Sequence, residues 1–287
     1  RHNVKVLIGF VMSGDRTVYA ATKLAGAKLV VAERNAPEMY SFRYRPFQRW
    51  LTFRLLGLAD RITVQLESFT AGYPRRLHNR MVAIPNPVPS PHSFARPNVA
   101  DASGRLTVLA ISRLDPVQKR VGYLLAAFAR IAQRFPDWRL RIIGDGPEKA
   151  ALLRRIDDFG LASRVRIEPS TPDVFDAYVQ SHLFAIPSLW EGFPNALAEA
   201  MSHGLPAVGF AQAAGVSELI GSDGGWLAVG LNDEVALAAA LASAMADGEE
   251  RLRRGRRATQ RMSQFAPDQQ FDCWETLLRS LTGNGMR

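Results

Sequence analysis

Residues 187–206 read PSLWEGFPNALAEAMSHGLP, and this stretch decides the fold class. A short apolar run, Leu183–Ile186, precedes it, and another, at 207–209, follows it. Pro194 suits the first turn of a helix, and the apolar residues after it repeat at helical spacing. The stretch therefore predicts a strand, a loop, a helix and a second strand, as in a parallel α/β sheet. The amides of Gly192–Ala196 lie where the helix begins, and such unpaired amides attract anions.

Two carboxylates flank this anion site, Glu191 on the loop and Glu199 inside the helix. A carboxylate repels a phosphate but accepts hydrogen bonds readily from hydroxyl groups. The helix N-terminus could bind phosphate, and the two carboxylates could accept hydrogen bonds from sugar hydroxyls. A diphosphate that joins two sugars offers both kinds of group. The pattern therefore favours a nucleotide sugar as the ligand.

Strands and helices alternate in both directions from this stretch. Such alternation predicts parallel sheets covered by helices on both faces, with ligands bound beyond the carboxyl ends of the strands. The segments 39–58 and 68–77 are each predicted to be one helix, the first with a kink at Pro46. The predicted strands are 4–10, 28–32, 61–65 and 81–84 in the N-terminal part, and 106–111, 140–143, 165–167, 183–186, 207–209 and 226–228 in the C-terminal part.

Two other loops follow predicted strands in the C-terminal part. Arg113 and Lys119 share the first, where a guanidinium fork and an ammonium would clamp a diphosphate, although two cations are also typical of a solvated loop. The second contains Gly144-Asp-Gly-Pro147, in which the glycines permit a tight turn or the close approach of a ligand. Both loops are predicted at the same edge of the sheet as Glu191.

Prolines mark the boundary between the two parts. Residues 85–101 hold five prolines and little periodicity, which is typical of a stiff linker. We expect a partial N-terminal domain at 1–88, a Pro-rich linker at 89–104 and a nucleotide-sugar-binding domain at 105–266. A C-terminal helix at 267–287 is expected to pack back on the N-terminal domain.

Composition excludes several classes of protein. The 287 residues are 47% hydrophobic and 22% charged, which is ordinary for a folded chain and rules out disorder. No apolar run is long enough to span a bilayer. The single cysteine, Cys273, excludes an internal disulfide and a cysteine zinc site, and this fits a reducing cytoplasm.

The excess of positive over negative charge lies in the N-terminal third. The net charge is +9, and residues 1–100 hold 15 Lys and Arg against 5 Asp and Glu. Arginines alternate with aromatic residues over Met39–Leu56, a mixture that suits an anionic membrane surface. A helix with one buried aromatic face and one solvated basic face explains the pattern equally well, and nucleic acid is the least favoured partner.

The chain resembles the retaining, nucleotide-sugar-dependent glycosyltransferases of the GT-B fold, family 4, over nearly its whole length. The resemblance rests on the motifs IPNPV at 84–88, ISRL at 111–114 with Lys119, IGDGP at 143–147 and EGFPNALAEAM at 191–201. It implies two Rossmann-like, doubly wound α/β domains. It also implies an enzyme that moves a hexose or N-acetylhexosamine from a UDP-linked donor with retention of configuration.

The resemblance implies roles for individual residues. Arg113 and Lys119 would hold the donor diphosphate and neutralise the leaving group, and Glu191 would contact hydroxyls of the donor sugar. No metal or other cofactor is implied, because cations and a helix end supply the positive charge. The other implied donor-binding residues are Gly144, Arg166, Gly192, Phe193, Asn195, Ala196 and Glu199.

The N-terminal part departs from the family pattern. Its first strand matches what is usually the middle of the domain, so we expect a fragment in which this domain is incomplete. Glu33, Arg34 and Asn35, in the stretch ERNAP, resemble a signature of bacterial members that build surface polysaccharides. They are expected on the acceptor side, although a local Glu33–Arg34 ion pair would explain them as well.

The expected acceptor is lipid-linked or a polysaccharide, reached from the cytoplasm at the inner membrane face. Another GT-B enzyme, such as a nucleotide-sugar epimerase or a phosphorylase, is a second interpretation. A third is a nucleotide-sugar-binding fragment without catalytic activity.

Overall fold

The computed structural model describes residues 4–10 and 14–283, which form two compact units. Residues 1–87 and 265–287 make the N-terminal unit, and residues 88–264 make the C-terminal unit. Each unit is built on its own parallel sheet. The α/β class and the parallel sheets predicted from the sequence are confirmed.

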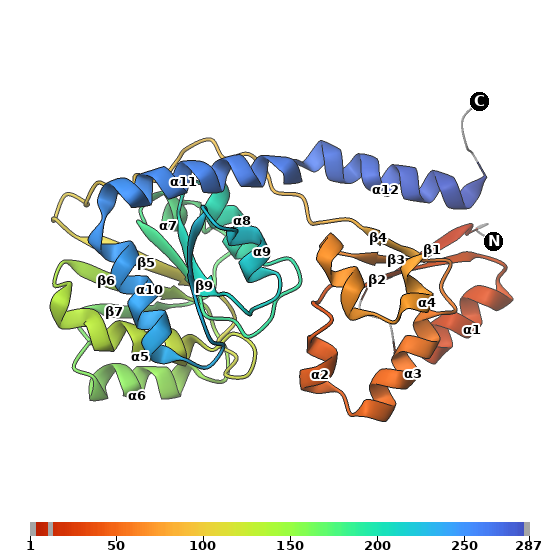
Figure 1. Cartoon of the computed structure of the whole chain (residues 1–287), viewed down its shortest axis with the longest axis horizontal. Helices are drawn as coiled ribbons and strands as arrows, with labels where there is room; N and C mark the ends of the chain where they lie inside the picture. Colours follow the sequence, from red (N-terminus) through yellow and green to blue (C-terminus); the bar gives the residue numbers. More distant parts are fainter. Residues whose placement is uncertain (1–3, 11–13, 284–287) are drawn as a thin grey trace. The chain divides into compact units, whose positions relative to one another are not determined.

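The N-terminal unit has four parallel strands in the order β1-β2-β3-β4. Helices α1 and α3 lie on one face of this sheet, and α12 lies on the other (Figure 1). Its strands are β1 Val6–Phe10, β2 Lys28–Ala32, β3 Arg61–Val64 and β4 Met81–Ala83. Its helices are α1 Arg16–Leu24, α2 Met39–Arg43, α3 Pro46–Leu56, η1 Glu67–Gly72, α4 Arg75–His78 and α12 Pro267–Thr282.

Helix α12 closes the hydrophobic core of the N-terminal unit. Leu277 is 5% exposed and clusters with Val30 of β2 and Ile84 after β4. Trp274, one turn earlier in the helix, packs against the same cluster, and its ring lies 6.3 Å from that of Phe10. The last helix of the chain therefore supplies apolar surface that the first strands need in order to bury theirs.

Leu277→Ala should destabilise the N-terminal unit by about 2–4 kcal/mol, because it removes buried methyl groups and leaves a cavity. Hydrogen exchange read by mass spectrometry, which reports each unit separately, should show faster exchange in β2 and α12. The exposed neighbour Thr276→Ala is the control and should change the free energy of unfolding by less than about 0.5 kcal/mol. Equal protection in both variants would mean that α12 is not part of this core.

The C-terminal unit has six parallel strands in the order β10-β9-β8-β5-β6-β7. Helices α5, α6 and α10 cover one face of the sheet, and α8 and α9 cover the other (Figure 1). Its strands are β5 Leu106–Ile111, β6 Trp138–Ile143, β7 Val165–Glu168, β8 Leu183–Ile186, β9 Ala207–Phe210 and β10 Gly225–Ala228. Its helices are α5 Val121–Ile131, η2 Ala132–Arg134, α6 Lys149–Asp158, α7 Phe175–Val179, α8 Asn195–Ser202, α9 Val216–Ile220, α10 Glu234–Ala246, α11 Gly248–Met262 and η3 Ser263–Phe265.

The strand order reverses direction between β5 and β8: the chain runs from β5 toward β7 at one edge of the sheet, and from β8 toward β10 at the other. At such a point the loops after the two strands separate and leave a crevice at the carboxyl edge. The loops that contain Arg113 and Glu191 follow β5 and β8, so the topology alone brings these two motifs together.

Residues 89–104, predicted as a linker, are part of the C-terminal unit, which begins at residue 88. The amide of Ala95 donates to the carbonyl of His203 at 2.8 Å. The buried guanidinium of Arg251 donates to the carbonyls of Pro97, Ala244 and Met245. Its burial lowers the pKa of Arg251 to about 10, so it stays charged at neutral pH. This segment forms no strand, and hydrogen bonds from its backbone to His203 and Arg251 fix it to the rest of the unit.

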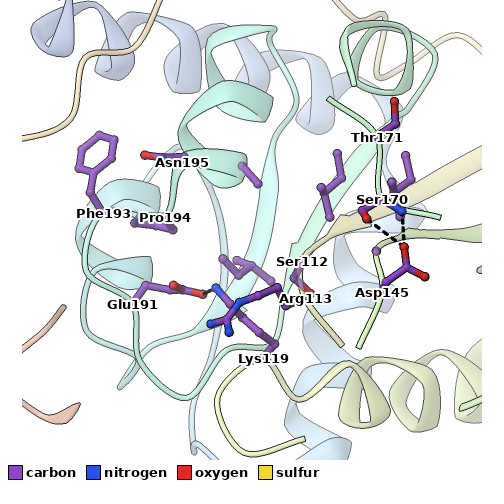
Figure 2. A pocket seen from close by; sticks show the side chains of 15 residues that line it. Ser112, Arg113, Lys119, Asp145, Ser170, Thr171, Glu191, Phe193, Pro194 and Asn195 are labelled. Atoms are coloured by element: carbon purple, nitrogen blue, oxygen red, sulfur yellow. Dashed lines mark hydrogen bonds and ion pairs between the residues drawn. The ribbon is translucent and has the colours of Figure 1, made fainter. Parts of the chain in front are cut away.

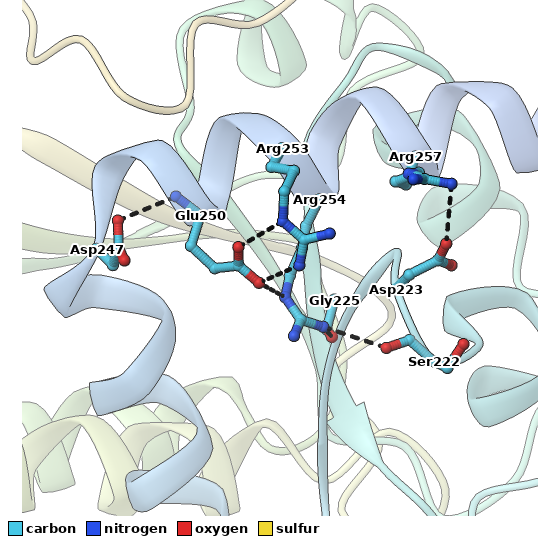
Figure 3. Close-up of polar contacts among 8 residues, drawn as sticks. All are labelled: Ser222, Asp223, Gly225, Asp247, Glu250, Arg253, Arg254 and Arg257. Carbon is cyan, nitrogen blue, oxygen red and sulfur yellow. Dashed lines mark hydrogen bonds and ion pairs between the residues drawn. The ribbon is translucent and has the colours of Figure 1, made fainter.

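Helix α11 carries an ion-pair network on its surface (Figure 3). Asp247 begins the helix, because its carboxylate accepts the amide of Glu250 at 3.0 Å. The Glu250 carboxylate then accepts from Arg253 and Arg254, and Arg254 also donates to the carbonyl of Gly225 at the start of β10. Hydrogen bonds from these arginines lower the pKa of Glu250 to about 2. The network joins α11 to the edge of the sheet.

Two predicted helices are interrupted. The expected helix 39–58 is two helices, α2 and α3, because the chain is extended at Tyr44 and Arg45. A residue before proline disfavours the helical conformation, so Pro46 begins a helix instead of kinking one. The expected helix 68–77 is η1 followed by α4, with Tyr73 and Pro74 in extended conformations between them.

Candidate functional site

The C-terminal unit holds a pocket of about 400 Å³ at the carboxyl edge of its sheet (Figure 2). The segments after β5, β6, β7 and β8 and the start of α8 form its wall, which is where the strand pattern predicted a ligand. The volume suits a small molecule. The residues that line it are Ile111, Ser112, Arg113, Lys119, Ile143, Gly144, Asp145, Ser170, Thr171, Ile186, Glu191 and Phe193–Ala196.

An ion pair lies at the centre of this pocket. Lys119 donates from Nζ to Oε1 of Glu191 at 2.6 Å, and Ser188 donates from Oγ to the same oxygen at 2.6 Å. The two ionic side chains are 17% and 7% exposed. Oε2 of Glu191 takes no hydrogen bond from the described residues. The carboxylate is thus held by one oxygen and can accept a hydroxyl of a ligand with the other.

Arg113 contributes a second cation to the same wall. Its side chain is exposed, and no carboxylate of the described residues lies within ion-pair distance of its guanidinium. A guanidinium with no carboxylate partner can bind a phosphate by two parallel hydrogen bonds. Together with Lys119 it makes this side of the pocket cationic, as the sequence predicted.

Helix α8 directs its N-terminus at the pocket. Asn195 and Ala196, its first residues, line the wall together with Phe193 and Pro194. The eight-residue helix leaves its first amides without partners inside the helix, and the helix dipole adds partial positive charge there. Phosphate binds readily at such a terminus when cations converge on it.

Gly215 fixes the position of the Glu191 loop. The amide of Glu191 donates to the carbonyl of Ala214 at 3.0 Å. A Cβ atom on Gly215 would lie 2.4 Å from the carbonyl oxygen of Gly192, and φ at Gly215 is +78°. No side chain fits at this position without moving the loop. The glycine at 215 is visible in the sequence. Its close contact with Gly192, which lies 23 residues earlier in the chain, appears only in the structure.

Asp145 joins two of the loops that line the pocket. Its carboxylate accepts the amide of Ser170 at 2.7 Å and the hydroxyl of Ser170 at 2.9 Å, and it pairs with Lys149 at 2.7 Å. These hydrogen bonds, that of Lys149 first, lower the pKa of Asp145 to about 2. The carboxylate holds the Ser170–Thr171 segment after β7 against the glycine turn after β6.

Asp145→Asn should weaken nucleotide binding by about 3- to 10-fold, because one charge-assisted link between the loops is lost. Ser170→Ala removes only the hydroxyl bond and should cause the smaller loss. Because the folded pKa lies below the normal value of 3.8, the link contributes stability above about pH 4. That contribution should disappear as the pH falls through about 2. Calorimetric titration with UDP measures the loss of nucleotide affinity. A UDP affinity of Asp145→Asn equal to that of the unmodified chain would contradict the prediction.

Three predicted donor-binding residues lie outside the pocket wall. Glu199 sits in α8, and its Oε2 accepts the hydroxyl of Tyr178 at 2.8 Å. Gly192 is buried in the loop after Glu191. Arg166 lies within β7, two residues before the strand ends, and its exposed side chain is not part of the pocket wall. Ser170 and Thr171, beyond that end, line the pocket instead.

The predicted acceptor residues line a pocket of the N-terminal unit. Glu33, Arg34 and Asn35 follow β2, and together with Asp15 they line a pocket of about 330 Å³. Glu33 is 5% exposed, and its Oε2 accepts the hydroxyls of Tyr40 at 2.5 Å and Tyr73 at 3.0 Å. Burial, together with this carboxylate, raises the pKa of Tyr73, which keeps its hydroxyl protonated as a donor. Arg34 itself donates to Asn86.

Within residues 4–10 and 14–283, no group of three or more His, Cys, Asp or Glu side chains is arranged to hold a metal ion. No described helix combines the length and apolar character needed to cross a bilayer. The segment Met39–Leu56 forms the two short helices α2 and α3, in which the side chains of Phe47 and Trp50 are 70% and 50% exposed to solvent.

Comparison with known families identifies the domain that holds the pocket of Arg113, Lys119 and Glu191. Residues 105–247 match the family described as "Glycosyl transferases group 1". Arg113, Lys119 and Glu191 all fall inside the match. The C-terminal unit therefore carries a glycosyl transferase domain, and the class predicted from the sequence is confirmed for it.

Curated relatives extend this likeness into the N-terminal unit. The chain is 36% identical over 207 residues to an exopolysaccharide phosphotransferase of Streptomyces coelicolor, which covers 70% of this chain and 21% of the relative. It is 31% identical over 171 residues to the amylovoran biosynthesis glycosyltransferase AmsD of Erwinia amylovora, which covers 60% and 47%. The chain thus spans less than half the length of both relatives.

Solved structures confirm the GT-B fold. Sucrose-phosphate synthase of Thermosynechococcus elongatus superposes with a TM-score of 0.83 at 19% identity, covering 98% of this chain and 74% of that one. HepE of Anabaena, solved in complex with UDP, gives a TM-score of 0.80 at 18% identity, with coverage of 96% and 79%. At these identities the likeness concerns the fold alone.

Proposed function

We propose that this protein is a retaining glycosyltransferase of family 4 that moves a hexose or N-acetylhexosamine from a UDP-linked donor. One observation carries the proposal. Arg113, which has no carboxylate partner among the described residues, the Lys119–Glu191 pair and the N-terminus of α8 all line a single pocket in a glycosyl transferase domain. HepE, of the same fold, was solved with UDP, which supports a uridine nucleotide.

The charges in the pocket suggest how transfer is assisted. Breaking the bond between the sugar and the diphosphate leaves negative charge on the diphosphate. Arg113, Lys119 and the amides of α8 would stabilise that charge, so the proposal requires no metal. Glu191 would accept a hydroxyl of the donor sugar with its free oxygen and position the reacting carbon. Tyr178 would orient Glu199 toward the ribose through the hydrogen bond at 2.8 Å.

The acceptor is proposed to bind the N-terminal unit. Glu33, held by two tyrosine hydroxyls, would position the attacking hydroxyl, and Arg34 and Asn35 would contact neighbouring groups. AmsD, named for amylovoran biosynthesis, supports a polysaccharide or lipid-linked acceptor. Phe47, Trp50 and the arginines of α2 and α3 would hold the protein to an anionic membrane surface on the cytoplasmic side.

Calorimetric titration of the chain with UDP, GDP and ADP, without divalent metal, tests the proposal. UDP should bind tightest, and one UDP-sugar should then be turned over with release of UDP and retention of configuration. Absence of UDP binding would overturn the proposed donor. Binding of a UDP-sugar without transfer to any lipid-linked or polysaccharide acceptor would favour the fragment that binds but does not catalyse.

A further inference from the structure

The N-terminal unit contains a second cavity, of about 670 Å³, between α3 and the turn that follows η1. Nothing in the proposed donor chemistry uses it. We propose that it binds the apolar chain of a lipid phosphate or diphosphate, namely the part of the acceptor nearest its head group. This inference rests on the proposed function, since it specifies the acceptor as an amphiphile. We call the cavity the aromatic groove, and its lining residues are Ser41, Tyr44, Pro46, Arg49, Trp50, Phe53, Gly72, Tyr73 and Pro74.

The walls of the aromatic groove suit a hydrocarbon chain. Phe53 and Tyr73 are 5% and 3% exposed, and their rings lie 5.5 Å apart, so they form a fixed floor. Trp50 and Tyr44, which are 50% and 36% exposed, complete its wall at the surface. Aromatic rings and prolines offer broad apolar surface and few polar groups, and contact with a lipid chain would remove that surface from water.

The charge beside the groove is positive. The guanidinium of Arg49 lines the groove, where it donates to Oγ of Ser41 at 3.1 Å and lies over the ring of Phe53 at 5.5 Å. Arg54 lies over the ring of Trp50 at 5.2 Å. Within the described residues, no carboxylate is within ion-pair distance of either arginine. The apolar groove can hold a hydrocarbon chain, and the arginine beside it is available to bind a phosphate at the end of that hydrocarbon chain.

The aromatic groove adjoins the polar pocket of Glu33. Tyr44 lines both, and Tyr73 lines the groove while its hydroxyl donates to Oε2 of Glu33 at 3.0 Å. Tyr40, between them in the core, donates to the same oxygen. A polar head in the Glu33 pocket and an apolar chain in the groove would therefore be parts of one amphiphilic ligand.

Substitution of Phe47 distinguishes binding in the groove from simple adsorption of this surface to a membrane. It stacks on Trp50 with ring centroids 5.9 Å apart and is the more exposed of the two, but it does not line the groove. If the surface only adsorbs to lipid headgroups, both aromatic residues contribute to binding. If the groove holds a chain, Trp50 and Arg49 contribute and Phe47 does not.

Farnesyl diphosphate, kept below its critical micelle concentration, is the probe, and the full chain is titrated by calorimetry without nucleotide. We expect saturable binding that Trp50→Ala and Arg49→Gln each weaken about tenfold. Phe47→Ala should change the affinity less than about twofold. All three sites are at the surface or on its rim, and circular dichroism checks that each variant folds.

The proposal would be overturned if farnesyl diphosphate does not bind, or if Phe47→Ala and Trp50→Ala weaken its binding equally. Inorganic diphosphate should bind at least about tenfold more weakly than the prenyl form, and equal affinity would mean that the groove takes no chain. A UDP titration of the same samples separates the hypotheses. UDP binding without prenyl binding refutes only the groove, and the reverse refutes the proposed donor site.

Discussion

Replacing Glu191 with glutamine is expected to slow sugar transfer by about 10²- to 10³-fold while leaving UDP affinity unchanged or slightly higher. Glutamine keeps the volume of the side chain but removes its charge. The hydroxyl of the donor sugar would then lose its strongest acceptor at the reacting end. Lys119, which now donates to Glu191 at 2.6 Å, would be freed to bind the diphosphate more fully.

UDP release from the donor that calorimetry identifies measures the rate, and titration with UDP measures the affinity. Glu168→Gln is the matched control, because it also breaks an arginine pair in the same unit, with Arg141 at 2.8 Å, yet lies outside the pocket wall. That control should keep both rate and affinity. A Glu191→Gln variant that loses UDP affinity in proportion to its rate would contradict the assignment of Glu191 to the sugar.

The sequence predicted the edge of the sheet that holds the pocket, because the relevant signals are local. Each short apolar run gives a strand, and each strand is followed at once by the residue that matters, such as Arg113 after β5. Parallel strands end at one edge, so loops that are far apart in the chain were correctly brought together. The alternation alone therefore predicted the pocket that Arg113, Lys119 and Glu191 line.

Partners that come from distant segments could not be predicted in this way. Tyr178 reaches Glu199 across 21 residues, Ser170 reaches Asp145 across 25, and Tyr73 reaches Glu33 across 40. Each is an ordinary hydroxyl residue in a loop or a short helix, and its role appears only when tertiary structure brings it near a carboxylate. Sequence patterns report which face is buried and not which hydroxyl meets which acid.

Arg166 shows the limit of reasoning from strand ends. The apolar alternation ended β7 near residue 167, which put Arg166 beside the ligand loops. The strand in fact continues through Glu168, whose carbonyl accepts the amide of Gly144 at 2.9 Å. The predicted and the observed ends of β7 differ by one residue, and a strand end is the point that decides which residues can reach the site.

Replacing Arg113 with alanine is expected to weaken both UDP binding and transfer by about 10- to 100-fold. This is the range for the loss of one or two charged hydrogen bonds, at about 1.5–3 kcal/mol. Arg113 has no carboxylate partner among the described residues, so its removal leaves no buried charge behind and the fold should be unaffected. The loss would then report phosphate binding directly, in contrast to Glu191, which affects the rate and leaves the nucleotide bound.

The control for charge is Arg154→Ala, an exposed position on α6 outside the pocket wall, which also lowers the net charge by one. It should leave UDP affinity within about twofold, because salt screens the charge of an exposed side chain that does not contact the ligand. Uridine, which lacks phosphate, should bind equally to the Arg113→Ala variant and the unmodified chain. If uridine affinity falls as far as UDP affinity, Arg113 shapes the base pocket and does not hold the diphosphate, and the division of roles between Arg113 and Glu191 is wrong.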